Sequence, residues 1–480
     1  MNILALEAST SSAKAVIYSD TKGIIAARDR AYDPNISNVV TQDPDGIYRA
    51  LLDCGGSLLE SHGKDIQGEI DAIALCSTWH SLLITDKQGK LVDRILTWAD
   101  NRSADIVNRY KKDTGLVNDI YKRTGCPAHT NFPLWKWMHF KENCDIDTTS
   151  LRLSSQSDYI FKRMTGDWGV SRSVASGSGF LNIHTLDWDE HILEFAGLAA
   201  EQLAPLQDPE YTAPLGAEAA EALNVREGIP VVITGPDGAL NQVGAGAMGE
   251  GVMTMSVGTS GAIRMATDNP ILPEVPSTWC YYIAEGKRLA GAATSGAGNC
   301  VNWFVKTLNK NKYSYDDLES FIDETRLMDA PVFLPFMFGE RSPGWEGSRL
   351  GGFTQLSGDH GLGQLYYAVL EGILLNIYQC YEILTQVGGV PHDIRISGGI
   401  ENSKFWLQMA ADIFQREIQT FDLEHSSTMG AIAMALKVLG SMNSLQEFKL
   451  KPRETIVPNR DKAKFYEHRF QKYLEWYHRA

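Results

Sequence analysis

The feature that most constrains this chain is a strand–turn–strand pattern that occurs twice, once at the start and once past the middle. The first copy, residues 3–19, joins two apolar runs through the small residues of segment 8–12. The second copy, residues 252–266, joins two apolar runs through the turn GTSG at 258–261. Short apolar runs separated by turn residues are typical of β-hairpins. The repeat predicts two related domains that face each other, although two Gly/Ser turns can also resemble each other by chance.

Strand and helix patterns alternate along the whole chain, which predicts an α/β fold. The expected strands are 3–7, 14–19, 71–76, 82–85, 230–234, 252–257, 262–266 and 393–396. The expected helices are 45–60, 101–114, 133–141, 216–223, 364–386, 403–415 and 428–439. The glycine-rich stretch AGAMGEG separates the two halves, so we place the boundary between a domain of residues 1–245 and a domain of residues 246–480.

Composition narrows the class of partner. Lys and Arg total 44 against 59 Asp and Glu, a net charge of −15, which argues against a nucleic-acid or anionic-membrane partner. No apolar stretch approaches the ~20 residues of a membrane span, and the start lacks the pattern of a signal peptide. The 7 cysteines are scattered without a CxxC pair, which favours a reducing compartment. We therefore expect a cytoplasmic protein that acts on a small molecule.

The turn of the first hairpin has the composition of a phosphate-binding loop. Ser9, Thr10, Ser11 and Ser12 place hydroxyls beside free backbone N–H groups, and Lys14 adds positive charge. Taken alone, the turn could equally be an ordinary solvated one. Together with a second such turn across a cleft, it predicts a site for the phosphate chain of a nucleotide.

A carboxylate, Asp237, closely follows the expected strand VVIT within the glycine-flanked stretch GPDGALNQVGAGA. Loops at the carboxyl ends of strands approach ligands in α/β folds. A carboxylate in this place can take a proton from a hydroxyl nucleophile during phosphoryl transfer. The alternative is a turn aspartate with local backbone bonds.

Two further segments have the composition of binding loops. In SGGIENS, residues 397–403, paired glycines let a ring or ribose approach the backbone, and a following helix offers N–H groups to anions. Residues 78–103 combine aromatic rings with short polar side chains, as a polyol site requires. His80 lies in this segment and could equally be a structural histidine.

Together these motifs resemble the FGGY family of carbohydrate kinases over about residues 2–445. Further segments in the family's order are NFPLWKWMHFKEN (131–143), SQSDYIFKRMTGD (155–167) and GSRLGGFTQLSGDHGLGQLYYAVLEGILLNIY (347–378). The resemblance implies two actin-like, ribonuclease-H-like domains that flank a cleft for ATP and substrate and close around both. It also implies Mg²⁺-dependent transfer of a phosphoryl group from ATP to a sugar or sugar acid, and it makes a homodimer a reasonable expectation.

The resemblance implies roles for individual residues. Asp237 would be the general base. Glu7, which stands where the family usually has aspartate, would organise magnesium with it. Nucleotide binding would fall to Ser9, Thr10, Ser11, Ser12, Lys14, Gly258, Thr259, Gly298, Asn302, Gly398, Gly399 and Ser403. Substrate binding would fall to Trp79, His80, Ser81, Asp158 and Arg102. For Asp158 the alternative is an acidic helix cap.

Within the family, the stretches WHSL, TWADNRS, GFLNIHTLDWD and EGILLNIY are most similar to the gluconate kinase branch. We therefore expect conversion of D-gluconate to 6-phosphogluconate, with Arg102 or Lys136 pairing with the substrate carboxylate. One alternative keeps the fold and phosphorylates xylulose or another ketose or polyol. Another is an actin-like nucleotide-binding regulatory protein without sugar turnover.

Overall fold

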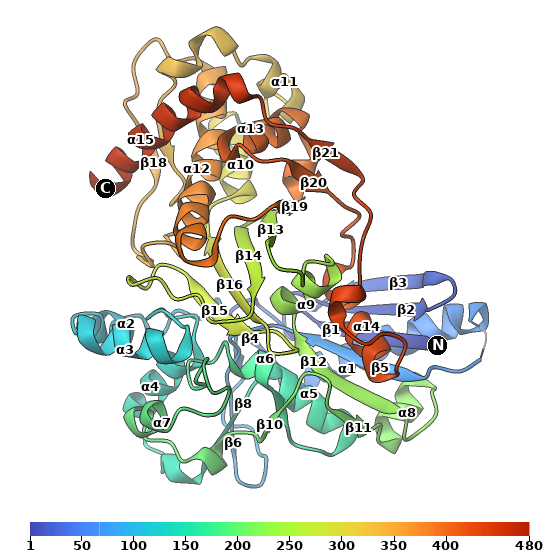
Figure 1. The fold of residues 1–480 in the computed structure, drawn as a ribbon. Helices are drawn as coiled ribbons and strands as arrows, with labels where there is room; N and C mark the ends of the chain where they lie inside the picture. The colour runs from blue at the N-terminus through green and yellow to red at the C-terminus, as the bar shows by residue number, and fades with distance from the viewer. Residues whose placement is uncertain (67, 480) are drawn as a thin grey trace.

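Two large mixed β-sheets organise the computed structural model, which describes residues 1–66 and 68–479 (Figure 1). The first sheet has the order β11-β12-β5-β1-β2-β3, and the second has the order β15-β16-β14-β13-β19-β20-β21. The first comprises β1 (Asn2–Ala8), β2 (Ser12–Ser19), β3 (Gly23–Ala31), β5 (Ala72–Ser77), β11 (Thr212–Pro214) and β12 (Pro230–Pro236). The second comprises β13 (Val252–Val257), β14 (Gly261–Thr267), β15 (Trp279–Tyr282), β16 (Arg288–Thr294), β19 (Asp393–Ser397), β20 (Ile418–Thr420) and β21 (Glu454–Ile456).

The two sheets repeat one topology. In the first, β1, β2 and β3 form an antiparallel meander, while β5 and β12 run parallel to β1 and β11 closes the edge antiparallel. In the second, β13, β14 and β16 form the meander, β19 and β20 run parallel to β13, and β21 closes the edge. Only β15 is extra. The duplication predicted from the two hairpins is therefore present.

Both faces of the first sheet are buried, because the side chains of β1 alternate between two cores. Leu4 and Leu6 pack under α1 (Pro44–His62), α5 (Gln156–Thr165) and α8 (Ala217–Leu223). Ile3 and Ala5 pack on the opposite side, against α14 (Ser426–Val438). Helix α14 comes from the second half of the sequence, yet it lies on the first sheet beside α9 (Asp237–Gly244) (Figure 1).

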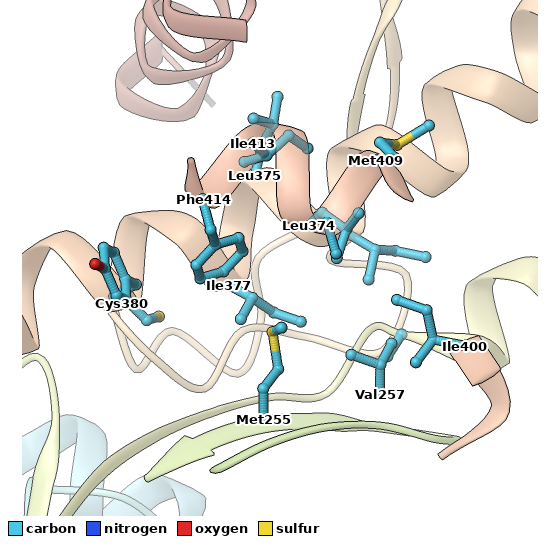
Figure 2. Close-up of a cluster of buried hydrophobic side chains, with 14 of the residues drawn as sticks. Met255, Val257, Leu374, Leu375, Ile377, Cys380, Ile400, Met409, Ile413 and Phe414 are labelled. Carbon is cyan, nitrogen blue, oxygen red and sulfur yellow. The ribbon is translucent and has the colours of Figure 1, made fainter. Parts of the chain in front are cut away.

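The core of the second sheet lies under a long helix, α12 (Leu362–Gly388). Met255 and Val257 of β13 point toward α12 and α13 (Lys404–Phe414), where they contact a dense apolar cluster (Figure 2). Further helices of this half are α10 (Gly298–Trp303), α11 (Tyr315–Ser320) and α15 (Ala463–Arg479). The opposite face of the sheet is thereby left to the cleft between the two halves. No helix of the described residues is long and apolar enough to cross a membrane.

Each predicted strand and helix is present, with one correction. The single helix expected over 101–114 is two helices, α2 (Ala104–Tyr110) and α3 (Thr114–Thr124). The chain breaks between them because the Asp113 side chain accepts a hydrogen bond from the N–H of Leu116 and starts a new helix. The remaining elements are α4 (Pro133–Asn143), α6 (Arg172–Ala175), α7 (Glu190–Ala196), β4 (Thr41–Gln42), β6 (Leu83–Asp86), β7 (Ile95–Leu96), β8 (Leu151–Ser154), β9 (Val170–Ser171), β10 (Leu206–Gln207), β17 (Val332–Leu334) and β18 (Gly352–Thr354).

Candidate active site

A cavity of about 300 Å³ lies between the two halves and receives side chains from both hairpins. The first half contributes Thr10, Thr78, Trp79, His80, Trp98 and Asp237, and the second half contributes Ser260, Arg264, Trp279, Tyr281 and Arg341. The residues come from segments that are far apart in the sequence, so only the facing arrangement of the two sheets creates this cavity. We call it the central cavity.

Asp237 is the first residue of α9, directly after β12, and its side chain is partly buried. Its Oδ1 accepts a 2.7 Å hydrogen bond from the N–H of Gly238. Burial and the charge of Glu7 together raise the pKa of Asp237 to about 6, against the opposing effects of Arg264 and Lys14. A carboxylate with a pKa in this range is suited to accept a proton near neutral pH.

Glu7 and Lys14 face each other across the first hairpin, where they are register partners in β1 and β2. Lys14 Nζ donates a 3.0 Å hydrogen bond to Glu7 Oε1. The other oxygen, Oε2, accepts from the hydroxyl of Ser427 at the start of α14. Glu7 is only 2% exposed. The carboxylate therefore ties the first hairpin to α14 as well as facing the region of Asp237.

The turn of the first hairpin is closed by its own serines. The Ser9 N–H and hydroxyl both donate to the carbonyl of Ser12, at 3.0 and 2.8 Å, and the Ser12 N–H donates to Ser9 Oγ at 3.0 Å. Thr10 and Ser11 are left at the tip, and Thr10 lines the central cavity. The hydroxyl of Thr10 also accepts a 3.0 Å hydrogen bond from Trp98 Nε1. Two of the four hydroxyls thus shape the loop instead of facing the cavity.

A second cavity of about 510 Å³ brings together most of the predicted nucleotide-binding residues of the second half. Those that line it are Gly258, Thr259, Gly298, Asn302, Gly399 and Ser403. Further lining residues that were not predicted from the sequence include Tyr315, Asp316, Glu319, Tyr366 and Trp406. They belong to three helices, α11, α12 and α13, which come together only in the folded chain.

Two glycines are required where this cavity meets the second hairpin. Gly298 donates its N–H to the carbonyl of Gly258 at 2.8 Å, and a Cβ at Gly298 would lie 2.6 Å from that oxygen. Gly398 has φ +103°, and a Cβ there would lie 2.6 Å from the carbonyl oxygen of Val257. Close backbone approach is the reason for glycine at both positions.

His80 enters the central cavity with its neutral imidazole. Its Nδ1 lies 2.8 Å from the carbonyl oxygen of Gly177 and must carry the proton, since that oxygen can only accept. Burial lowers the pKa of His80 to about 3, so the ring stays uncharged. Nε2 is thus left as an acceptor for a hydroxyl group. Beside it, Trp79, Trp279 and Tyr281 form an aromatic wall, with the last two rings stacked at 4.4 Å between centroids.

Ser81 and Asp158 lie behind His80 and do not line the central cavity. Ser81 Oγ accepts a 3.0 Å hydrogen bond from the N–H of Gln156. Asp158 forms a capping box with Ser155 at the start of α5, which is the helix-cap alternative considered for this residue. Ser81 therefore binds the first residue of α5, and Asp158 caps that helix.

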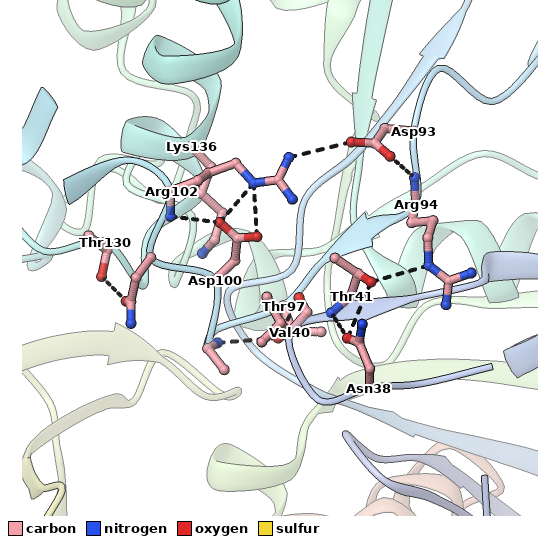
Figure 3. Close-up of polar contacts among 12 residues, drawn as sticks. Asn38, Val40, Thr41, Asp93, Arg94, Thr97, Asp100, Arg102, Thr130 and Lys136 are labelled. Carbon is pink, nitrogen blue, oxygen red and sulfur yellow. Dashed lines mark hydrogen bonds and ion pairs between the residues drawn. The ribbon is translucent and has the colours of Figure 1, made fainter. Parts of the chain in front are cut away.

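Arg102 and Lys136 also lie outside the central cavity. Arg102 Nε donates to Asp100 at 2.9 Å (Figure 3), and the Arg102 side chain is 39% exposed. Lys136 is fully buried, and its Nζ donates to the carbonyl oxygens of His80 and Asn131. Burial lowers the pKa of Lys136 to about 7. The lysine thus holds two backbone segments together.

The cations that do line the cavity are Arg264 and Arg341. Their Nε atoms are buried and have no hydrogen-bond partner among residues 1–66 and 68–479. Burial lowers the pKa of Arg264 to about 10, which still leaves it charged at neutral pH. The sequence offered one signal for Arg264, a lone cation in an otherwise apolar strand, and none for Arg341.

Known proteins resemble this chain over both of its halves. The sequence matches the N-terminal domain of the FGGY family of carbohydrate kinases over residues 2–244 and the C-terminal domain over residues 253–438. A gluconokinase of Bacillus licheniformis is 30% identical over 467 residues, covering 92% of this chain and 88% of the relative.

Solved structures show the same fold. A ligand-bound xylulose kinase from Lactobacillus acidophilus has a TM-score of 0.93 and 28% identity, covering 99% of this chain and 97% of that chain. A gluconate kinase from the same organism has a TM-score of 0.91 and 28% identity, again covering 99% and 97%. With its two facing actin-like domains, the chain belongs to the FGGY family of carbohydrate kinases.

Proposed function

We propose that this carbohydrate kinase phosphorylates D-gluconate to 6-phosphogluconate, with ATP as the donor and Asp237 as the general base. The observation that carries the proposal is the composition of the central cavity. It combines a carboxylate of raised pKa, an aromatic wall with a neutral histidine acceptor, and two arginines with unpartnered Nε atoms. A polyol chain fits the first two features, and a carboxylate group on that chain fits the third.

In the proposed reaction, Asp237 orients and deprotonates a substrate hydroxyl. The hydroxyl oxygen attacks the γ-phosphorus of ATP while its proton passes to the Asp237 carboxylate. The bond between the γ-phosphorus and the oxygen that bridges to ADP breaks, and ADP leaves with that electron pair. The tips of the two hairpins, at Thr10 and Thr259, would hold the phosphates on either side of the transferred group.

The residues at the first hairpin are compatible with Mg²⁺. The effect of Glu7 on the pKa of Asp237 means that two carboxylates act on one region. Mg²⁺ is typically bound through one or two carboxylates together with phosphate oxygens and water. When bound, the ion would neutralise charge on the phosphates, and Glu7 and Asp237 would hold it directly or through water. A Glu7→Gln variant should therefore bind Mn²⁺, used as a paramagnetic probe with ADP present, several-fold more weakly.

We favour gluconate over xylulose as the substrate because Arg264 and Arg341 line the central cavity. A guanidinium matches a planar carboxylate in a bidentate fashion, whereas xylulose has no charged group to pair with it. The name of the B. licheniformis relative supports gluconate, while the L. acidophilus xylulose kinase supports the alternative.

A coupled ADP-release assay over gluconate, xylulose and glycerol tests the proposal. We expect the highest kcat/KM with gluconate. In Arg264→Met, loss of a charged hydrogen bond of about 1.5–3 kcal/mol should weaken gluconate binding roughly 10- to 150-fold. Turnover of a neutral sugar should change little when it is measured well above the pKa of Asp237, where that carboxylate stays ionised without the charge of Arg264. If kcat/KM is higher with xylulose, xylulose replaces gluconate as the proposed substrate. If no sugar stimulates ADP release, a regulatory nucleotide-binding protein is favoured instead.

A further inference from the structure

Two buried glutamines connect the turn of the first hairpin to the loop that carries His80. Gln42 in β4 and Gln156 at the start of α5 are both 0% exposed. Gln42 Nε2 donates to the carbonyl oxygens of Ser9 and Thr10, at 3.1 and 3.0 Å. Gln156 Nε2 donates to Gln42 Oε1 at 2.8 Å. Gln156 Oε1 accepts from the N–H and the hydroxyl of Thr78, both at 3.3 Å.

The backbone groups at the two ends determine how both amides are oriented. Gln42 must direct its NH₂ group at the turn, because two carbonyl oxygens can only accept. Gln156 must direct its oxygen at Thr78, because a backbone N–H can only donate. The remaining NH₂ of Gln156 then meets the remaining oxygen of Gln42. The side-chain oxygen and nitrogen of each glutamine are thus both hydrogen-bonded, in one continuous series of hydrogen bonds from the first turn to Thr78.

Both ends of this chain lie on the central cavity, since Thr10 and Thr78 both line it. The N–H of Gln156 also donates to Ser81 Oγ, so this one residue holds both ends of the segment 78–81. Between them, His80 adopts a left-handed backbone with φ +64°. Such a conformation persists only where the surrounding contacts enforce it.

We propose that Gln42 and Gln156 are positioning residues that couple sugar binding to binding of the nucleotide phosphates. A sugar that orders segment 78–81 fixes the hydrogen bonds of Thr78, and the two amides transmit this constraint to the carbonyls of Ser9 and Thr10. The inference rests on the proposed role of the first hairpin in phosphate binding. Filling the space would not by itself require glutamine at these two positions. A buried amide is costly unless it is hydrogen-bonded, and an apolar side chain would fill the same volume.

Calorimetry on the full chain measures this coupling as the ratio of the ADP dissociation constants without and with saturating gluconate. For the wild type we expect a ratio within the usual coupling range of about 5–150. In Gln42→Met and in Gln156→Met, which keep the length of the side chain, the ratio should fall at least threefold toward one. The double variant should lose no more than either single variant, because the two amides act as one unit.

Gln202 provides a matched control away from both cavities. It is buried, its Nε2 donates to the carbonyls of Thr148 and Leu151 at 2.8 and 2.9 Å, and its Oε1 accepts from the N–H of Ala199. Gln202→Met should therefore lower thermal stability about as much as the other two variants while leaving the coupling ratio unchanged. If Gln42 and Gln156 have a purely structural role, all three methionine variants should lose thermal stability to a similar extent and keep the wild-type coupling ratio.

Isosteric variants keep the test decisive if a methionine variant does not fold. Gln42→Glu places a carboxylate oxygen opposite the carbonyl oxygens of Ser9 and Thr10, where the amide N–H groups donated. Gln156→Glu places one opposite Gln42 Oε1. Each substitution removes a hydrogen bond of the chain and should also lower the coupling ratio. Two results would overturn the coupling but leave the proposed function standing, provided that the wild type phosphorylates the sugar. One is a coupling ratio that is unchanged in the folded variants, and the other is a coupling ratio below two in the wild type. If another sugar is the substrate, it replaces gluconate in the titration. If no sugar of the panel is phosphorylated, the proposed function and the coupling both fail.

Discussion

Asp237 lies among charges that act on it in opposite directions. Burial and Glu7 favour its protonated form, while Arg264 and Lys14 favour the carboxylate. The result is a group that is ionised at neutral pH yet basic enough to accept a proton as the new phosphate ester forms. At the residue scale, the environment supplied by three distant segments turns an ordinary aspartate into a candidate base.

Replacement of Asp237 by asparagine keeps the shape of the side chain and removes its basicity. Because general-base catalysis commonly contributes about 10²–10⁴-fold, kcat of Asp237→Asn should fall by that factor. ADP affinity and the urea unfolding midpoint should stay close to the wild-type values. Steady-state kinetics with calorimetry provide the comparison. A variant that retains more than about a tenth of the wild-type kcat would point to another base.

The pH profile should report the same carboxyl group. The reactive form is the carboxylate, and its pKa is raised to about 6. Activity should therefore be complete above that pKa and be lost as the pH falls through it, by about tenfold per pH unit. A plot of kcat/KM against pH should show this acidic limb, and the residual activity of Asp237→Asn should lack it. A flat profile from pH 5 to pH 7 would contradict the assignment.

At the scale of elements, the second hairpin depends on the helix that follows β16. The turn at Gly258 is held by N–H groups from the start of α10, and Gly298 lies against it without space for a side chain. The cavity of about 510 Å³ is therefore shaped by a contact between two backbones.

Gly298→Ala should displace this turn, because the added Cβ would lie 2.6 Å from the carbonyl oxygen of Gly258. Overpacking of this kind costs about 1–3 kcal/mol, which corresponds to roughly 5- to 150-fold weaker nucleotide binding. The KM for ATP should rise while the KM for the sugar changes little. Gly358→Ala is a suitable control, because a Cβ there meets no atom within 4 Å. Equal effects on both substrates would indicate general damage instead.

On the scale of the whole molecule, the two halves are interlocked. Helix α14 lies between β20 and β21 of the second sheet in sequence, but it packs on β1, β5 and β12 of the first, beside α9. Its buried residues include Ile432, Met434 and Leu436. The proposed boundary at 245/246 therefore separates two sheets without separating two cores.

A fragment of residues 1–245 should consequently fail to fold alone. Each buried apolar side chain of α14 contributes about 1.5–3 kcal/mol, and a domain has only about 5–15 kcal/mol of net stability. The fragment should bind the dye ANS and unfold in urea without a cooperative transition, unlike the full chain. Addition of a synthetic peptide spanning 421–442 should restore part of the transition. Cooperative unfolding of the fragment by itself would show that α14 is dispensable.

Local chemistry along the chain was sufficient for much of this protein. Short apolar runs in β1 and β13 specify strands, and Ser9 and Gly258 mark the turns that follow them, so the repeated hairpin could be predicted directly. The position of Asp237 after a strand, and the paired glycines at 398 and 399, are likewise local signals. They depend on backbone conformation and hydrogen bonding within a few residues, which the sequence displays.

The tertiary structure alone decided which charged groups reach the central cavity. Arg102 and Lys136 looked suitable for a substrate carboxylate, but Asp100 pairs with the first and two backbone carbonyls hold the second. Arg264 and Arg341 line the cavity instead, because the two sheets bring β14 and a distant loop to the same cleft. Charge and hydrogen bonding act through space over a few ångströms. Partners from segments hundreds of residues apart are therefore invisible until the chain is folded.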